Sequence, residues 1–481
     1  MTQQPVIKMP KTFPTVSPPP VTLSSPGLFA LVTGQLLTQL DFSIVNVALE
    51  RIGASLGTNA NGLVLVVACY GLSFAALLGT GGRLGDRYGR KRLFLIGIVG
   101  FCIVSMICGL ATNLVTMLVG RFLQGVFGAI LMPQILATIH ATLHGPEHSR
   151  AVGIYTAIAG LSVVIGQVVG GWLVSADLFG LGWRLGFFIN LPVCAIILVL
   201  GVISIPDTRS NVASRTDAWG VLLFALFLLC LLLPVSLGSD WPATRWFIIA
   251  LPPIGIAFWW IETRQEATGG KPLLPPSLLR RPMVLIGFLA EAAVTFSYAG
   301  YIFITAFCLQ SALGFSPQQS GDSFIGLGLM FFIGSLASKR LRERLSDHGT
   351  FVLGAGLTIS GILLTATLIR FFGLSLNFGH IIAVSGLVGL GNAFMLTSAY
   401  RIALSHVEKH HAGEASVAVS TVQQGCFAIG TASGGVVYAG LLPSFDHALA
   451  FAGAAGWLVC LPIIAAGVVL WKKPRPARQQ S

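Results

Sequence analysis

Charge is what this sequence lacks most. Asp, Glu, Lys and Arg together make up only 10% of its 481 residues, whereas 54% of the residues are hydrophobic. A water-soluble domain usually has about a quarter of its residues charged. The composition therefore excludes a soluble protein with an ordinary polar surface and indicates a chain that crosses a membrane many times.

The sequence also lacks the motifs of ATP-driven transport, metal catalysis and serine hydrolysis. Its one Gly-Lys pair, Gly270-Lys271, is followed by Pro272 and does not match a phosphate-binding loop. No H-E-x-x-H or G-x-S-x-G pattern occurs. The 8 cysteines lie inside apolar runs, without the spacing of metal ligands. We therefore expect no enzyme activity, no cofactor and no metal site.

The few basic residues are concentrated in short loops between apolar runs. The segment from Gly81 to Arg92, GGRLGDRYGRKR, is rich in Arg and Lys and has a single acid, Asp86. Such loops stay in the cytoplasm because Lys and Arg resist translocation. Every second loop then carries most of the remaining positive charge, and both termini are predicted to be cytoplasmic. The net charge of +12 is explained by topology, and we expect no nucleic-acid partner.

Apolar runs of about the length that spans a bilayer, roughly 20 residues, recur along the chain. They predict an all-α polytopic membrane protein with fourteen transmembrane helices. The predicted spans are 28–50, 62–81, 93–111, 113–139, 151–174, 184–205, 218–237, 246–262, 283–308, 318–338, 350–371, 378–404, 413–440 and 447–471.

The series of spans has a weak internal repeat. The basic loop at 82–92 follows the second span, and a similar loop at 334–344 follows the tenth. The repeat predicts two six-helix halves, with two inserted helices between them and a binding site where the halves meet. The predicted segments are a disordered cytoplasmic tail at 1–27, the N-terminal half at 28–206, the two inserted helices and linkers at 207–282, the C-terminal half at 283–471 and a basic cytoplasmic tail at 472–481.

Ionisable side chains inside the apolar runs are costly to bury and usually face a cavity or a partner. Asp41 lies near the middle of the first span, on the same helical face as Gly34 and Thr38. We interpret Asp41 as a carboxylate that takes up a proton or attracts a cation; the alternative is a structural hydrogen bond between helices. Asp322, nearer the outer end of a later span, is a further candidate.

A second acid, Glu291, lies in the ninth predicted span. Thr295, Tyr298 and Thr305 follow it on the same helical face. A carboxylate beside hydroxyl groups and an aromatic ring suits a lipophilic cation, through charge pairing and a cation–π contact. Burial favours the protonated carboxyl group, which proton exchange requires. The alternative is a residue in a water-filled vestibule.

Arg121 and three glycines are the remaining candidates inside spans. Arg121 shares a helical face with Gln124, so a neighbouring helix can approach its charge and bias the protonation of a nearby acid. The alternative is an arginine that extends toward the membrane surface. Gly166, Gly170 and Gly171 form a small-residue face in the fifth span, which predicts close helix packing.

Several of these motifs resemble those of one transporter family. GRLGDRYGRKR, residues 82–92, resembles the signature loop of the major facilitator superfamily. LDFSIVNVAL, residues 40–49, is similar to the first-span motif of the fourteen-helix drug:proton antiporters of that superfamily. Arg121 with Gly125, and the glycines of 160–171, are similar to the fourth- and fifth-span motifs of the same branch.

The resemblance implies a major facilitator fold in the cell inner membrane. Two residues depart from the motifs, since Gln167 and Glu50 stand where prolines are usual; these departures put the export direction and the shape of the outer mouth in question. From the residues and the resemblance together, we predict proton coupling by Asp41, Arg121 and Glu291; substrate binding by Asp41, Gln124, Glu291, Thr295 and Tyr298; a cytoplasmic gate of Gly82, Arg83, Asp86, Gly89 and Arg90; and helix packing by Gly166, Gly170 and Gly171.

The function that we expect is proton-coupled antiport, which exports amphipathic and cationic drugs or biocides. One alternative is proton-coupled transport of a metabolite or a siderophore-like compound. Another, from a different class, is a membrane sensor or enzyme that transports nothing. The expected partners are a small amphipathic substrate, protons and the lipid bilayer; a periplasmic adaptor protein stays open as a further partner.

Overall fold

A computed structural model describes residues 22–209, 218–237, 242–270, 272–405, 407 and 412–471. Within these ranges the regular secondary structure is helical throughout, and no strand occurs. The predicted C-terminal tail at 472–481 and most of the predicted N-terminal tail lie outside the described residues.

The N-terminal half contains the first six predicted spans. The sixth of them is divided between two helices, α6 and α7, which follow two short 3-10 helices, η1 and η2. The elements are α1 (Ser25–Leu56), α2 (Ala60–Tyr88), α3 (Arg90–Gly109), α4 (Leu114–Thr142), α5 (Gly145–Ala176), η1 (Leu178–Gly180), η2 (Gly182–Arg184), α6 (Leu185–Phe188) and α7 (Asn190–Ser204).

The rest of the chain contains the inserted helices and the C-terminal half. One long helix, α13, contains parts of two predicted spans, which are separated by a break at Ser346, where φ is +66°. The elements are α8 (Ala218–Leu237), η3 (Pro242–Trp246), α9 (Phe247–Ala267), α10 (Pro276–Leu279), α11 (Pro282–Ser311), α12 (Pro317–Asp322), α13 (Ile325–Phe372), η4 (Gly373–Ser375), α14 (Phe378–Leu404), α15 (Ala412–Leu441) and α16 (His447–Trp471).

The helices have the length and composition of membrane spans. Ten helical segments in the described part of the chain are long and apolar enough to cross a bilayer, and one of them, Pro317–Ser375, covers two predicted spans. Shorter apolar helices occur at Leu161–Ala176 and Trp219–Leu231. Each of the fourteen predicted spans overlaps a helical segment. The protein is therefore an all-α, multi-pass membrane protein.

The predicted boundary of the N-terminal tail is wrong by three residues. Helix α1 begins at Ser25, inside the stretch predicted to be disordered. The Ser24 hydroxyl accepts a hydrogen bond from the Gly27 amide at 3.3 Å and caps the helix. Pro26 lies in the first turn, where its missing N–H costs nothing and its fixed φ favours the helix. Pro26, inside the stretch predicted to be disordered, is therefore part of a helix start.

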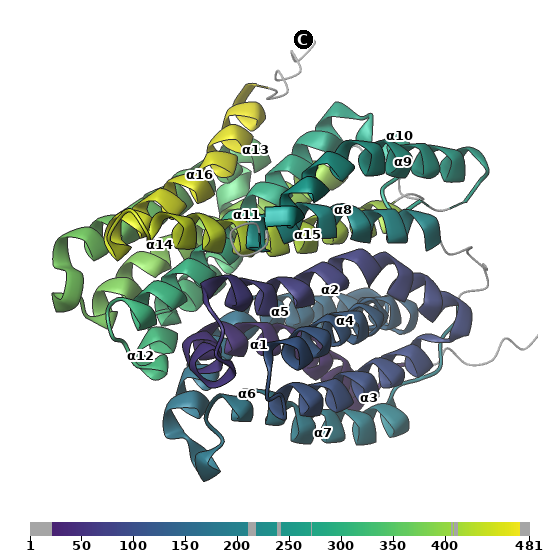
Figure 1. Ribbon diagram of the computed structural model, residues 1–481. Helices are drawn as coiled ribbons and strands as arrows, with labels where there is room; N and C mark the ends of the chain where they lie inside the picture. Colours follow the sequence, from purple (N-terminus) through teal and green to yellow (C-terminus); the bar gives the residue numbers. More distant parts are fainter. Residues whose placement is uncertain are drawn as a thin grey trace, which may run out of the picture.

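The inserted helices lie against both halves. Within the N-terminal half, α1 packs on α5 and α2 packs on α4; in the C-terminal half, α11 packs on α15 and α13 on α14. The halves meet where α2 contacts α15 and where α5 contacts α12 and α13. Helix α8 contacts both α2 and α15, and α9 lies on the outer side of α8 (Figure 1).

The three glycines predicted for helix packing lie on two different interfaces of α5. A Cβ atom built on Gly166 would lie 2.6 Å from Ser43 Cβ, and one on Gly170 would lie 2.9 Å from Ile44 Cα, both in α1. A Cβ on Gly171 would instead lie 2.5 Å from the Pro317 carbonyl oxygen in α12. The first two glycines therefore allow close packing within one half, and the third allows close contact between the halves.

We predict that Gly170→Ala destabilises the protein because the new methyl group has no room beside α1. Overpacking of this kind costs about 1–3 kcal/mol. The matched control is Gly356→Ala in α13, where a Cβ atom would meet nothing within 4 Å. The control should be neutral or slightly stabilising, since alanine favours a helix over glycine by up to about 1 kcal/mol. Thermal unfolding of both variants in detergent tests this, and equal melting temperatures would contradict it.

Candidate functional site

A network of polar side chains is enclosed in the N-terminal half around Asp41 of α1. An Oδ2 atom of Asp41 lies 2.5 Å from Arg121 Nη1 of α4, and neither side chain has any exposed surface. The other carboxylate oxygen accepts hydrogen bonds from Asn190 at 2.7 Å and from Gln124 at 3.1 Å. Both oxygens of the carboxylate are therefore fully engaged.

A second layer of contacts holds the network in place. Ser105 of α3 accepts hydrogen bonds from Gln124 at 2.9 Å and from Asn190 at 3.2 Å. The Arg121 guanidinium donates from Nε to the Val66 carbonyl at 3.1 Å and lies 4.5 Å from the centre of the Tyr70 ring. The ion pair is thus surrounded by side chains from α2, α3, α4 and α7.

The sequence analysis selected Asp41, Arg121 and Gln124 separately, and the structure brings them into direct contact. It assigned no role to Ser105, Tyr70 or Asn190. All three are polar side chains inside apolar runs, which was the one signal available.

The Asp41 carboxylate is neutralised by a partner in this conformation. A buried ion pair keeps its energy only while both charges remain together, because removing one leaves the other unpaired. A cationic substrate would have to displace Arg121 before it paired with Asp41. The predicted role of Asp41 in substrate binding therefore has a structural obstacle that the sequence did not reveal.

Glu291 of α11 has a different environment. Its side chain is completely buried, and one oxygen accepts a hydrogen bond from Gln423 of α15 at 2.8 Å. The other oxygen has no hydrogen-bond partner, and no ion pair to Glu291 occurs in the part of the chain that the structure describes. Gln423 was not predicted, since nothing in its sequence context points to α11.

The other predicted binding residues lie near Glu291 along α11. The Thr295 hydroxyl donates to the Glu291 carbonyl oxygen at 3.0 Å, so it bonds to its own helix backbone. Thr295 and Tyr298 are half-buried, while the Thr305 side chain is fully buried. Asp322 is half-buried at the end of α12.

An aromatic contact lies between the two acids. The rings of Phe42 in α1 and Phe427 in α15 are 4.5 Å apart at their centres and meet edge to face. Phe42 adjoins Asp41 in the chain, and Phe427 is one helical turn from Gln423. This pair joins the helix that carries Asp41 to the helix that hydrogen-bonds Glu291, across the contact between the halves.

The basic loop between α2 and α3 is held by its own side chains. Arg90 forms an ion pair with Asp86 at 2.8 Å and donates to the Ala137 carbonyl of α4 at 3.0 Å. Between them, Gly89 has φ of +100°, a conformation that side chains disfavour. Arg83 donates to the Pro272 carbonyl at 3.0 Å, in the linker that follows α9. Four of the five predicted gate residues therefore make the turn or join it to other elements.

Gly82 is the exception among the predicted gate residues. A Cβ atom on Gly82 would make an ordinary 3.5 Å contact with Pro133, so the structure gives no steric reason for a glycine there. Gly81 and Gly85 do have such a reason, since a Cβ would lie 2.0 Å from the Ala129 carbonyl oxygen and 1.8 Å from Gln134 Oε1, respectively. The sequence analysis missed both, because spacing alone does not show how closely each glycine approaches α4.

The linker after α9 fills the contact between α2 and α15. Leu273 is 1% exposed, and its side chain lies against Gly79 of α2. The Val417 side chain of α15 lies against the same glycine. The next residue, Leu274, donates its backbone N–H to Glu262 at 2.7 Å. The segment thus connects the inserted helices to the end of α2 that carries the basic loop. Within the described residues, no group of three or more His, Cys, Asp or Glu side chains could hold a metal ion.

Residues 31–431 match the family model of the Major Facilitator Superfamily. The chain belongs to this superfamily. It is 34% identical over 434 residues to a probable actinorhodin transporter of Streptomyces coelicolor, an alignment that covers 89% of this chain and 74% of that protein. It is 32% identical to the puromycin resistance protein pur8 of Streptomyces alboniger, over 88% of this chain and 83% of the relative. The multidrug resistance protein Stp of Mycobacterium tuberculosis is 29% identical, over 87% and 76%.

Solved structures of the same fold agree with the arrangement of the helices. A bacterial homologue of the human lysosomal transporter Spinster, inward-facing and occupied, superposes with a TM-score of 0.65 at 16% identity, covering 93% of this chain and 97% of that one. A peptide transporter POT in complex with sulfate gives a TM-score of 0.68 at 14% identity, covering 94% and 97%. At such identities these neighbours establish the fold and nothing finer.

We predict that Asp41→Asn strongly destabilises this transporter-fold protein. Loss of one partner from a buried ion pair costs about 3–5 kcal/mol, because the Arg121 charge stays buried without its counterion. The double variant Asp41→Asn with Arg121→Met should recover much of that loss, since it removes both charges. Thermal unfolding of the three proteins in detergent measures this. A single variant as stable as the unmodified protein would show that the pair is not structural.

We predict that Asp86→Asn lowers transport severalfold with little loss of stability. The Asp86 and Arg90 side chains are 36% and 15% exposed, and pairs this accessible contribute below about 1 kcal/mol. The matched control is Asp446→Asn, which removes a charge from the exposed pair with Arg370, away from this loop. Transport in vesicles and reactivity of engineered cysteines in the loops distinguish gating from orientation. If Asp86→Asn transported normally, the loop would set the orientation of the protein in the membrane and would not act as a gate.

Proposed function

We propose that this protein is a drug-efflux transporter of the cell inner membrane, with both termini in the cytoplasm. The names of three relatives support export. The relatives include a tetracenomycin C resistance and export protein of Streptomyces glaucescens, 29% identical over 86% of this chain. They also include a puromycin resistance protein and a multidrug resistance protein. The concentration of Arg and Lys in every second predicted loop supports cytoplasmic termini, because basic loops resist translocation.

We propose further that Glu291 exchanges a proton for a cationic, amphipathic substrate. The observation that carries this is the difference between the two buried acids. Asp41 already has a cation, Arg121, whereas Glu291 has only the Gln423 amide and one oxygen without a partner. An ionised Glu291 would attract a cation, and a protonated one would release it. Competition between proton and substrate at one carboxyl group is sufficient for antiport.

In this mechanism Asp41 and Arg121 have a positioning role. They stay paired and hold α1 and α4 together, while Phe42 links α1 to α15 beside Gln423. The Asp86–Arg90 pair stabilises the conformation in which the cytoplasmic ends of α2 and α4 are close. Half-buried Tyr298 and Thr295 lie along α11 near the carboxyl group, where an aromatic ring favours a lipophilic cation.

We predict that Glu291→Gln abolishes proton-coupled transport in inverted membrane vesicles. Glutamine keeps the size of the side chain and its hydrogen bond to Gln423 but cannot exchange a proton. Substrate-driven dequenching of a pH-sensitive dye should therefore fall to background, a loss of at least about tenfold. The matched control is Glu147→Gln at the exposed start of α5, which should transport normally.

Two results would contradict this proposal. Full proton-coupled transport by Glu291→Gln would remove Glu291 from the coupling step and leave Asp41 as the acid to test. In inverted vesicles an exporter moves its substrate into the lumen. Movement of tetraphenylphosphonium or another cationic probe out of the lumen would therefore overturn export itself. Normal folding of the variant, shown by an unchanged melting temperature, makes either result interpretable.

A further inference from the structure

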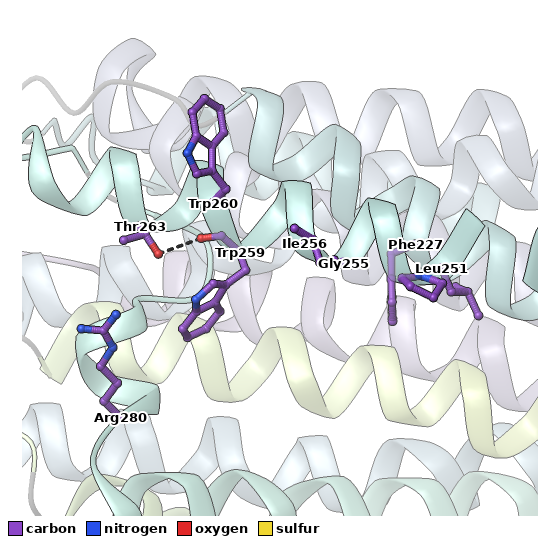
Figure 2. Close-up of a pocket in the computed structure, with 9 residues that line it drawn as sticks. Phe227, Leu251, Gly255, Ile256, Trp259, Trp260, Thr263 and Arg280 are labelled. Atoms are coloured by element: carbon purple, nitrogen blue, oxygen red, sulfur yellow. Dashed lines mark hydrogen bonds between the residues drawn. The ribbon is translucent and has the colours of Figure 1, made fainter. Parts of the chain in front are cut away.

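A groove on the inserted helices has no part in the proposed transport mechanism. It has a volume of about 720 Å³, within the range of small-molecule sites, and is formed by α8, α9 and Arg280, the residue just after α10. Figure 2 shows Phe227 and Leu251 toward one end and Arg280 at the other. Its lining includes Phe227, Leu251, Gly255, Ile256, Trp259 and Arg280.

The groove opens toward the lipid and not toward the interior of the protein. Only 6% of the apolar window of α9 is buried inside the protein, against 33% or more for every other segment long enough to span the bilayer in the described residues. Ile256 is 70% exposed and Trp259 is 40% exposed. An apolar surface of this kind on a multi-pass protein is covered by hydrocarbon in the membrane.

One end of the groove carries positive charge. Arg280 is exposed, and in the part of the chain that the structure describes it forms neither an ion pair nor a side-chain hydrogen bond. Arg264 is near the same end of α9, with its guanidinium 5.4 Å from the centre of the Trp260 ring. Indole rings and basic side chains are typical of the interface between hydrocarbon and headgroups. The two acids at this end of α9, Glu262 and Glu266, accept hydrogen bonds from the Leu274 N–H and from Ser277. Arg264 and Arg280 are exposed and therefore available to an anionic headgroup.

The length of the groove matches one leaflet. From Leu251 to Thr263 an α-helix rises by about 18 Å, at 1.5 Å per residue. Half of the hydrocarbon core of a bilayer is about 15 Å thick. The apolar wall therefore extends from the charged end to about the bilayer midplane, which is the reach of an acyl chain.

We propose that this groove binds one anionic phospholipid from the leaflet on the side of Arg280. The phosphate pairs with the Arg280 guanidinium, and an acyl chain lies along Trp259, Ile256 and Leu251 toward Phe227. The site joins a lipid to the helices that bridge α2 and α15. It stands independently of which substrate the protein exports.

Native mass spectrometry of the full-length protein in detergent tests the site. Dioleoylphosphatidylglycerol is titrated against dioleoylphosphatidylcholine, which has the same chains without net charge. We expect Arg280→Gln to weaken retention of the anionic lipid about fivefold, to the level of the neutral one. Arg92→Gln, which removes an exposed arginine from the basic loop, should retain the lipid normally.

A second variant tests the apolar wall without changing charge. Gly255→Leu places a side chain in the groove, where a Cβ atom would lie 3.7 Å from Phe227, and should reduce binding of both lipids by at least about fivefold. Leucine favours a helix more than glycine does, so this variant is expected to fold. If Arg280→Gln and Arg92→Gln lost the anionic lipid to the same extent, the attraction would be non-specific and the proposal would be overturned. A dimer in place of the lipid adduct, or displacement of the lipid by tetraphenylphosphonium, would overturn it in favour of a second copy or the transport substrate.

Discussion

Two opposite charges lie at the centre of the N-terminal half, where neither side chain is exposed. The bilayer and the packed helices offer no water to either charge, so each depends on the other and on the hydrogen bonds around them. Asp41 comes from α1 and Arg121 from α4, while Asn190, Gln124 and Ser105 complete the network from α7, α4 and α3. Helices that are far apart in the chain are therefore tied together at one point.

The C-terminal half has the opposite arrangement. Glu291 is as deeply buried as Asp41, yet its one partner in the described residues is the neutral amide of Gln423. The two acids thus have different chemistry because of their neighbours and not because of their own side chains. Between the halves, Phe42 and Phe427 make an edge-to-face contact, and Gly171 of α5 allows α12 to approach closely. A closely packed interface of this kind has a few discrete arrangements, which an alternating transporter requires.

The inserted helices do more than lengthen the chain. Helix α8 contacts α2 and α15, and the linker after α9 places Leu273 against α2 and the Pro272 carbonyl against Arg83. The signature loop is therefore coupled to the insertion as well as to α4. On its outer side, α9 carries the Trp-lined groove proposed to bind an anionic lipid. A lipid bound there would lie against α8, which contacts α2 and α15.

Composition, apolar run length and the distribution of Arg and Lys were enough to predict the membrane class and the helices, because a span is defined by local hydrophobicity. The same reasoning found Asp41, Arg121 and Glu291, since a charge in an apolar run is conspicuous on its own. Partners were not predictable: the Asp41–Arg121 and Glu291–Gln423 contacts join residues separated by 80 and 132 positions. Nor did spacing show that Gly81 and Gly85 leave no room for a side chain against α4, whereas Gly82 does. Local hydrophobicity was thus enough to locate the spans, whereas the neutralisation of Asp41 and not of Glu291 depends on the side chains that other helices bring beside each acid, which only the folded chain shows.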